Sequence, residues 1–171
     1  MKLFGRREKP PAEAVTRLDR DERVLTWADT ASGPVVATPL GLWLPGYEER
    51  LPWHLVDKAT WKNGILTLVP AVDTGDGVLV EQTPRAVRVT VPRDLPNTVR
   101  VRVQKAIAFT RHHPLPLDGP RRGVRVVGRR VPGRDGISWQ LVFDPGVDTD
   151  DPAVREAAAA YVAQARVELG V

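Results

Sequence analysis

Aromatic and ionisable side chains are concentrated in residues 50–61, which read RLPWHLVDKATW. Such residues could form a base-stacking platform for nucleic acid, a cage for a cation, or the core of a small β-rich domain. Trp53 and Trp61 are an even number of positions apart, so both would point to one face of an unbroken strand. We therefore predict that both tryptophans are structural and buried, and that Arg50 and Asp57 position the bend of the strands.

The histidines do not predict a catalytic or metal site. His54 has the opposite parity to the neighbouring tryptophan, so we expect it at the surface without a ligand or an acid–base role. His112 and His113 are expected at a helix end, where protonated imidazoles favour the negative end of the macrodipole. The sequence contains no cysteine, which excludes a thiol nucleophile, a disulfide framework and cysteine-ligated zinc.

Other sequence motifs for catalysis or ligand binding are also absent. The aspartates of residues 144–151 lack the glycine and glutamate positions of a calcium-binding loop, and helix capping explains Asp150 and Asp151 better. Ser32 and Ser138 do not lie in a nucleophile elbow, and no glycine-rich phosphate loop occurs. We expect a protein without enzyme activity, cofactor or metal.

The basic residues are unevenly distributed along the chain. Residues 85–134 hold 13 of the 25 lysines and arginines but only Asp94 and Asp118 of the 21 acidic residues. Two interpretations are open: a solvated face balanced by the acidic remainder of the chain, or a surface that binds an anionic partner. The candidate anion-binding patch consists of Arg100, Arg102, Lys105, Arg121, Arg122, Arg125, Arg129 and Arg130.

Short apolar runs between turn residues predict a series of strands in the first two thirds of the chain. Asn63-Gly64 is the strongest hairpin signal, and residues 85–91 alternate as a half-buried strand does. The other strands are expected within 23–30, 34–38, 41–46, 48–53, 57–72 and 78–83.

Two helices follow from apolar spacing and capping residues. Asp94 is placed to cap a helix over 95–112, in which Val99, Val103 and Ile107 share one face. An alanine-rich helix over 152–169 follows two further strands, expected within 123–132 and 137–145. Together these last elements predict a small β-β-α unit.

The order of about seven strands and one amphipathic helix resembles a pleckstrin-homology-like (PH-like) domain. The run Arg50-Leu51-Pro52-Trp53 is similar to a motif of bacterial PH-like and GRAM-like domains, and the whole chain resembles a group of small actinobacterial proteins. The resemblance implies an α+β fold in which a bent antiparallel β-barrel is closed by a helix and followed by the β-β-α extension. The expected division is a basic tail with a short helical turn over 1–20, a PH-like domain over 21–114 and the extension over 115–171.

The resemblance implies a binding module whose partner is a protein or an anionic lipid surface. The lipid site of the family requires basic residues in the first hairpin loop, whereas residues 28–34 contain none. Three expectations follow: an adaptor for an unknown protein partner, peripheral binding to anionic lipid through residues 85–134, and nucleic-acid binding. Nucleic acid ranks last because the aromatics are not interleaved with the charges. With no apolar run long enough to cross a membrane and no apolar run behind the basic start, we expect a cytoplasmic protein, with attachment to a membrane surface as the alternative.

Overall fold

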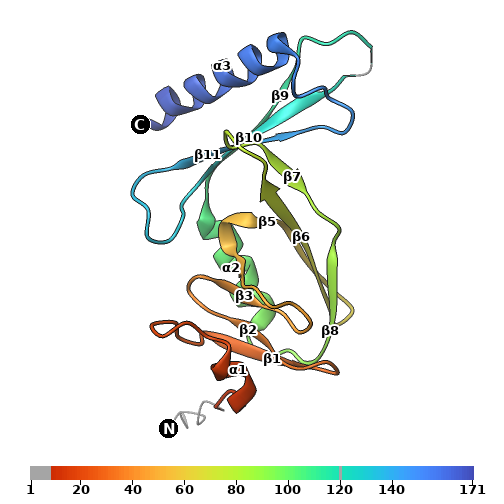
Figure 1. Cartoon of the computed structure of the whole chain (residues 1–171), viewed down its shortest axis with the longest axis vertical. Helices are drawn as coiled ribbons and strands as arrows, with labels where there is room; N and C mark the ends of the chain where they lie inside the picture. Colours follow the sequence, from red (N-terminus) through yellow and green to blue (C-terminus); the bar gives the residue numbers. More distant parts are fainter. Residues whose placement is uncertain (1–8, 120) are drawn as a thin grey trace, which may run out of the picture.

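The computed structural model describes residues 9–119 and 121–171, which form two sheets and three α-helices (Figure 1). The elements of the first part are α1 (Ala12–Thr16), β1 (Thr26–Thr30), β2 (Val35–Ala37), β3 (Gly41–Trp43), β4 (Leu51–Pro52), the 3₁₀ turn η1 (Trp53–Leu55), β5 (Val56–Lys62), β6 (Ile65–Asp73), β7 (Leu79–Glu81), β8 (Arg85–Val91) and α2 (Leu95–Ala106). Those of the second part are β9 (Ile107–Pro114), β10 (Gly123–Arg129), β11 (Ser138–Phe143) and α3 (Pro152–Leu169).

The large sheet is a curled antiparallel half-barrel. Its strands follow the order β4-β3-β2-β1-β8-β6-β5, and β7 pairs with β6 outside this path. Two meanders, β1 to β4 and β5 to β8, are joined where β1 pairs with β8, with Asp29 opposite Val91. The predicted α+β class with about seven antiparallel strands is therefore present, and α2 lies in the hollow of the sheet (Figure 1).

The core of the half-barrel lies between the sheet and α2. Leu95 and Val99 of the helix pack against Leu66 and Leu68 of β6 and against Val89 of β8, all buried. The predicted apolar face of the helix accounts for this packing, because residues four apart lie on one side. Helix α2 is thus fixed to the sheet along its apolar side, and its other sides are left for other contacts.

The predicted hairpin at Asn63-Gly64 is confirmed. Both residues have positive φ, 52° and 73°, as a two-residue turn between twisted strands requires. The turn joins β5 to β6, which pair in an antiparallel register.

The helix predicted over 95–112 is shorter than expected. It ends at Ala106, and Ile107–Pro114 continue directly as β9, which pairs with β10 along almost its whole length. Apolar spacing is compatible with helix in this stretch, but a ladder with β10 satisfies the backbone and overrides the local preference. The second sheet therefore has three strands, in the order β11-β10-β9.

Helix α3 covers one face of the small sheet, as Figure 1 shows. It begins at Pro152, where Asp151 accepts a hydrogen bond from the Ala153 N–H at 2.8 Å, and its C-cap is Gly170 in the left-handed conformation. Its predicted bounds are confirmed because proline after a capping aspartate and glycine after the last turn are strong local signals.

The short helical turn expected near the start of the chain is α1, whose Ala14 is buried against Trp27 and Trp43. Residues 1–8 of the predicted basic tail lie outside the described residues. Within the described ranges, no helix combines the length and the apolar composition needed to cross a membrane.

Candidate functional site

The two tryptophans of the opening stretch have different environments. Trp53 is 2% exposed and donates a hydrogen bond from Nε1 to the Thr38 carbonyl at 2.9 Å, which confirms its predicted burial. Trp61 is 36% exposed, so the prediction that it is buried is wrong. The 3₁₀ turn at Trp53 and a bulge between Val56 and Lys58 interrupt the strand, so the even spacing no longer places both indoles on one face.

Arg50 serves the fold. Its guanidinium contacts Asp19 at 2.6 Å and Glu22 at 3.0 Å, and it lies over the ring of Trp43. The side chain of Glu22 is fully buried and also accepts hydrogen bonds from Thr38 and Trp43. This network attaches the segment before β1 to β3 and β4.

A groove of about 480 Å³ runs between β5 and α2. Its apolar part includes Trp61 of β5 and Val103 of α2, and Arg100 and Gln104 bring polar groups. The complete lining is Ala59, Thr60, Trp61, Leu66, Pro96, Asn97, Val99, Arg100, Val103 and Gln104. A partly exposed indole in an apolar groove with a few polar groups is typical of a binding surface.

The groove follows the open edge of the half-barrel. β5 is the last strand in the sheet order, and among the described residues only β6 pairs with it. Its backbone N–H and C=O groups on the other side are therefore free of a strand partner, which makes β5 an edge to which an added strand can pair.

The seam between the two sheets contains a buried ion pair. Nη2 of Arg125 on β10 lies 2.9 and 2.8 Å from the two carboxylate oxygens of Asp57 on β5, whose side chain is 1% exposed. Arg129, also on β10 and fully buried, contributes Nη2 at 3.8 Å from Asp57. Asp57 thus links the half-barrel to the small sheet, and it also lies at the bulge of β5 between Val56 and Lys58; its predicted role in positioning the bend stays a prediction.

Charges at the seam shift two carboxyl pKa values in opposite directions. Burial alone would raise the pKa of Asp57, but the hydrogen bonds and charge of Arg125, with Arg129 adding, hold it below its ordinary value. The pKa of Glu81 is raised, first by a hydrogen bond to Asp57 and then by burial and the charge of Asp57. The arginines thus make ionisation of Asp57 easier, and the charge of Asp57 makes ionisation of Glu81 harder.

Two buried nitrogens at the seam have no hydrogen-bond partner. They are Nη1 of Arg129 and Nδ1 of His54. Arg129 donates from Nε to Gln140 at 3.0 Å, and Gln140 donates to the His54 carbonyl at 3.4 Å. Burial lowers the pKa of His54, and the charges of Arg129 and Arg134 lower it further, so this residue is neither fully exposed nor in a neutral field.

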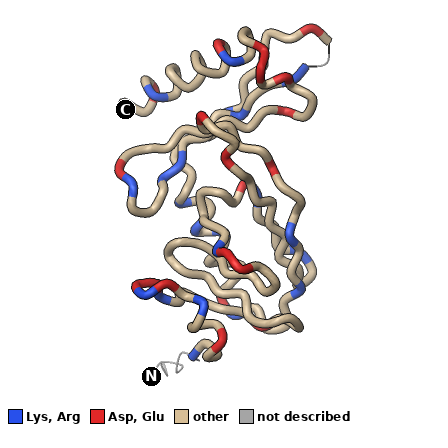
Figure 2. Tube along the Cα trace, in the orientation of Figure 1, with Lys and Arg blue, Asp and Glu red and all other residues tan. Residues whose placement is uncertain are grey.

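The structure divides the eight predicted patch residues among four places, and Figure 2 shows basic and acidic positions interspersed along the molecule. Arg100 lines the groove, and Arg125 and Arg129 lie in the seam. Arg121 and Arg122 precede β10, where Arg122 donates to the Gly146 carbonyl at 2.6 Å. The remaining three line a pocket of about 200 Å³ at the end of α2: Arg102, Lys105 and Arg130.

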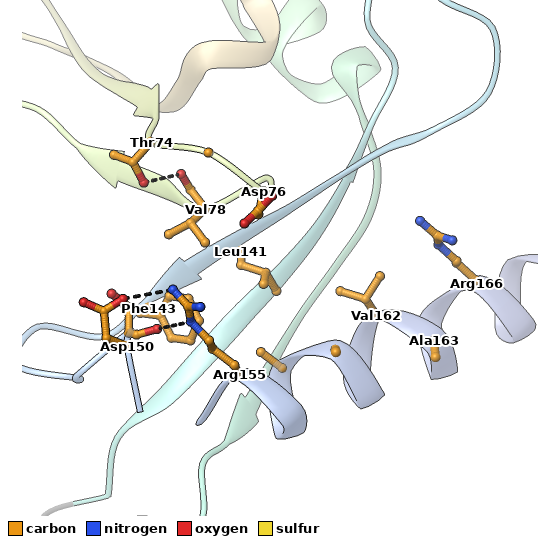
Figure 3. Close-up of a pocket in the computed structure, with 14 residues that line it drawn as sticks. Thr74, Asp76, Val78, Leu141, Phe143, Asp150, Arg155, Val162, Ala163 and Arg166 are labelled. Atoms are coloured by element: carbon orange, nitrogen blue, oxygen red, sulfur yellow. Dashed lines mark hydrogen bonds and ion pairs between the residues drawn. The ribbon is translucent and has the colours of Figure 1, made fainter. Parts of the chain in front are cut away.

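Another hollow, of about 620 Å³, lies between α3, β11 and the β6–β7 loop (Figure 3). Leu141, Phe143 and Val162 form apolar walls. Arg155 at one end is engaged with Asp150 at 2.9 Å, as the dashed lines in Figure 3 show. This hollow contains none of the residues that the sequence predicts as functional.

The remaining titratable residues considered in the sequence make structural contacts within the small sheet and α3. His112 and His113 lie on β9 instead of at a helix end: His112 pairs with Asp144 at 3.0 Å, and His113 stacks on Tyr161 of α3. Asp150, expected to share in capping α3, binds Arg155, and Asp151 alone caps the helix. Across the described residues there is no group of three or more histidine, aspartate or glutamate side chains placed to hold a metal ion.

Sequence reasoning missed three polar residues of the seam and the core, namely Glu22, Glu81 and Gln140. Each interacts with residues of other elements of the fold, so no spacing within a motif identifies it. Searches against protein-family models, curated proteins and solved structures found no match to the chain.

Proposed function

We propose that the chain is a noncatalytic PH-like interaction module that binds an extended segment of a partner protein along β5, in the groove against α2. The observation that carries the proposal is the partly exposed Trp61 beside an edge strand with no partner on its outer side. A large indole at 36% exposure in an apolar groove is an anchor that a partner can cover.

The curled antiparallel sheet is compatible with the PH-like part of the proposal, although its strand order is not clearly that of a PH-like domain. Two meanders joined through β1 and β8, with α2 in the open side, are compatible with a PH-like barrel. The lipid site of that family lacks support, because residues 31–34 of the β1–β2 loop carry no basic side chain. Binding of a protein segment therefore fits this chain better than binding of a lipid head group at that loop.

The groove dictates what the partner segment contributes. The backbone of the partner segment pairs with the free edge of β5, and these main-chain hydrogen bonds give affinity that depends little on the segment's sequence. Every second side chain of the segment faces the groove and gives specificity. One apolar side chain lies against Trp61 and Val103. Arg100 lines the same groove and Lys58 and Lys62 are exposed on β5, so acidic residues in the segment are favoured.

Selection of peptides from a random display library on the immobilised protein tests the proposal. We expect peptides with an apolar residue next to acidic ones, and hydrogen exchange should show slower exchange of β5 amides in the complex. Trp61→Ala should weaken binding about tenfold or more. The matched control is Tyr47→Ala, an aromatic side chain that is 40% exposed and lies outside the groove.

Three results would overturn the proposal. They are a selection that yields no binding peptide, peptides that leave β5 exchange unchanged, and equal binding by wild type and Trp61→Ala. Melting temperatures of both variants should match wild type, since each removes an exposed side chain.

A further inference from the structure

The pocket at the C-terminal end of α2 collects positive charge from two elements. Arg102 and Lys105 come from α2, and Arg130 follows directly after β10. The rest of the lining is apolar or backbone and contains no acidic residue: Pro39, Trp53, Ala106, Val131 and Pro132. Asp135, the acidic residue of the β10–β11 loop, does not line it.

These three cations have no counter-charge in the described chain. None of them forms an ion pair or a side-chain hydrogen bond with another described residue, in contrast to Arg50, Arg125 and Arg155. Like charges that share a small pocket repel one another, and an anion between them relieves the repulsion. The sequence places 19 of the 21 acidic residues outside residues 85–134, yet none of those that the structure describes lines this pocket.

The helix end explains only part of this arrangement. Cations in the last turn of a helix are stabilised by the negative end of its dipole, which accounts for Lys105. It does not account for Arg130, which comes from the other sheet and is held by a backbone hydrogen bond from its N–H to the Ala106 carbonyl at 2.8 Å. That bond also removes one free carbonyl from the helix end, so the pocket presents fewer acceptors to an incoming anion.

Further positive charge lies behind the pocket wall. Trp53, which lines the pocket, is followed by His54, and the guanidinium groups of Arg129 and Arg134 both act on that imidazole. Arg129 is fully buried and its Nη1 has no partner. Arg129 shares the Asp57 carboxylate with Arg125, so two guanidinium groups face one carboxylate on this side of the wall.

We infer that this pocket binds a phosphate monoester group through Arg102, Lys105 and Arg130. A volume of about 200 Å³ is large enough for one phosphate group with a small part of its ester, and too small for an extended polyanion. Two arginines and a lysine are the donors that phosphate prefers, because guanidinium groups bind it in a bidentate manner and the ammonium adds a point charge. The site is separate from the β5–α2 groove, so it does not depend on the proposed peptide binding.

Calorimetric titration of the full chain with glycerol 3-phosphate, and flotation with phosphatidylcholine vesicles with or without phosphatidic acid, test this inference. Both probes carry a phosphate monoester. Binding of glycerol 3-phosphate identifies a soluble ligand, and binding only to vesicles that contain phosphatidic acid identifies a lipid head group; either result supports the site.

Arg130→Gln and Lys105→Gln should each weaken binding of whichever probe binds by about tenfold or more. The matched control is Arg100→Gln, which removes the same charge from α2 but lies on the groove, where its side chain bonds to Asn97 and Gln104. This control should bind within about twofold of wild type.

The inference is overturned if neither probe binds, or if Arg100→Gln loses as much affinity as Arg130→Gln. It is also overturned if a DNA duplex binds more tightly than both probes and all three variants reduce that binding equally, because the attraction would then be diffuse. All three substituted side chains lie at the surface, and unchanged melting temperatures establish that the variants are folded.

Discussion

The two tryptophans of residues 50–61 are the same residue type in two different environments. Trp53 fills the core and satisfies its indole N–H internally, whereas Trp61 leaves a third of its surface to solvent in an open groove. The difference arises from the backbone between them, where a 3₁₀ turn and a bulge change the direction of the side chains. The two residues are chemically equivalent, and only their positions make one buried and the other partly exposed.

Truncation of these two side chains should affect stability very differently. Trp53→Ala removes a buried aromatic group and should lower the free energy of unfolding by about 3 to 5 kcal/mol. Trp61→Ala should change it by only about 0.5 kcal/mol. Urea unfolding of both variants beside wild type measures the difference, and equal losses would mean that Trp61 is as buried as Trp53.

The local turns and helix starts can be predicted from the sequence, but the exposure of Trp61 cannot. Asn63-Gly64 and Asp151-Pro152 determine a turn and a helix start because their conformational preferences act within a few residues. The bulge near Asp57 depends on the pairing of β5 with β6 and on Arg125, which lies 68 positions away. No pattern in the stretch itself reports such a contact.

At the scale of elements, the seam between the sheets depends on one acidic residue and its basic partners. The carboxylate of Asp57 on β5 is buried and forms ion pairs with Arg125 and Arg129 of β10. Removing one partner of a buried pair leaves an uncompensated charge, which costs more than the pair itself contributes. The seam is therefore expected to be sensitive to substitution and to acid.

Asp57→Asn should destabilise the protein by about 3 to 5 kcal/mol near neutral pH, because it leaves the buried Arg129 without a carboxylate. Because the folded pKa of Asp57 is lowered, its contribution is fully present above the ordinary value of 3.8 and is lost as the pH falls below it. The raised pKa of Glu81 acts oppositely: its contribution is present below its ordinary value of 4.5 and is lost as the pH rises through the raised value.

The deficit of Asp57→Asn relative to wild type should therefore be largest at about pH 7 and smaller at about pH 3. Urea unfolding at both values measures it, with Asp150→Asn as the control for an exposed carboxylate whose side chain is 86% accessible. A deficit that stays constant between the two pH values would contradict the assignment of the charge to Asp57.

A second contact between the sheets is made by the loop that joins β6 to β7. Gly77 accepts a hydrogen bond from the Leu141 N–H at 2.8 Å, and a Cβ on Gly77 would lie 2.6 Å from the Trp139 carbonyl oxygen. Gly46 has almost the same φ, 79° against 77°, but nothing within 4 Å of its Cβ position. Comparing alanine substitutions at these two glycines therefore separates backbone strain from a steric clash.

Gly46→Ala should cost about 1 to 2 kcal/mol, the strain of a left-handed conformation with a side chain. Gly77→Ala adds a clash with backbone and should cost about 1 to 3 kcal/mol more. Denaturant unfolding of the two variants provides the comparison. If they lose the same stability, the loop does not hold β11 against the half-barrel.

At the scale of the whole molecule, charge that is separated along the sequence is mixed in space. Residues 85–134 span parts of both sheets, so their basic side chains reach the groove, the seam and the pocket instead of one face (Figure 2). The half-barrel follows from strand signals in the sequence. Its junction with the small sheet does not, because the assignment of residues 107–114 to β9 depends on pairing with β10.

Helix α2 passes into β9 at Ile107 without a linker, and its sides carry residues of two different hollows. Arg100 and Val103 line the groove, while Arg102 and Lys105 line the basic pocket. An occupant that shifts α2 from one side must therefore displace groups on the other. Thermodynamic linkage then makes the effect mutual: a phosphate ligand that alters the affinity for a peptide by some factor is itself bound with an affinity altered by the same factor. Because no linker separates α2 from β9, coupling between the two surfaces depends on whether an occupant moves α2; ligands that leave the helix in place bind independently.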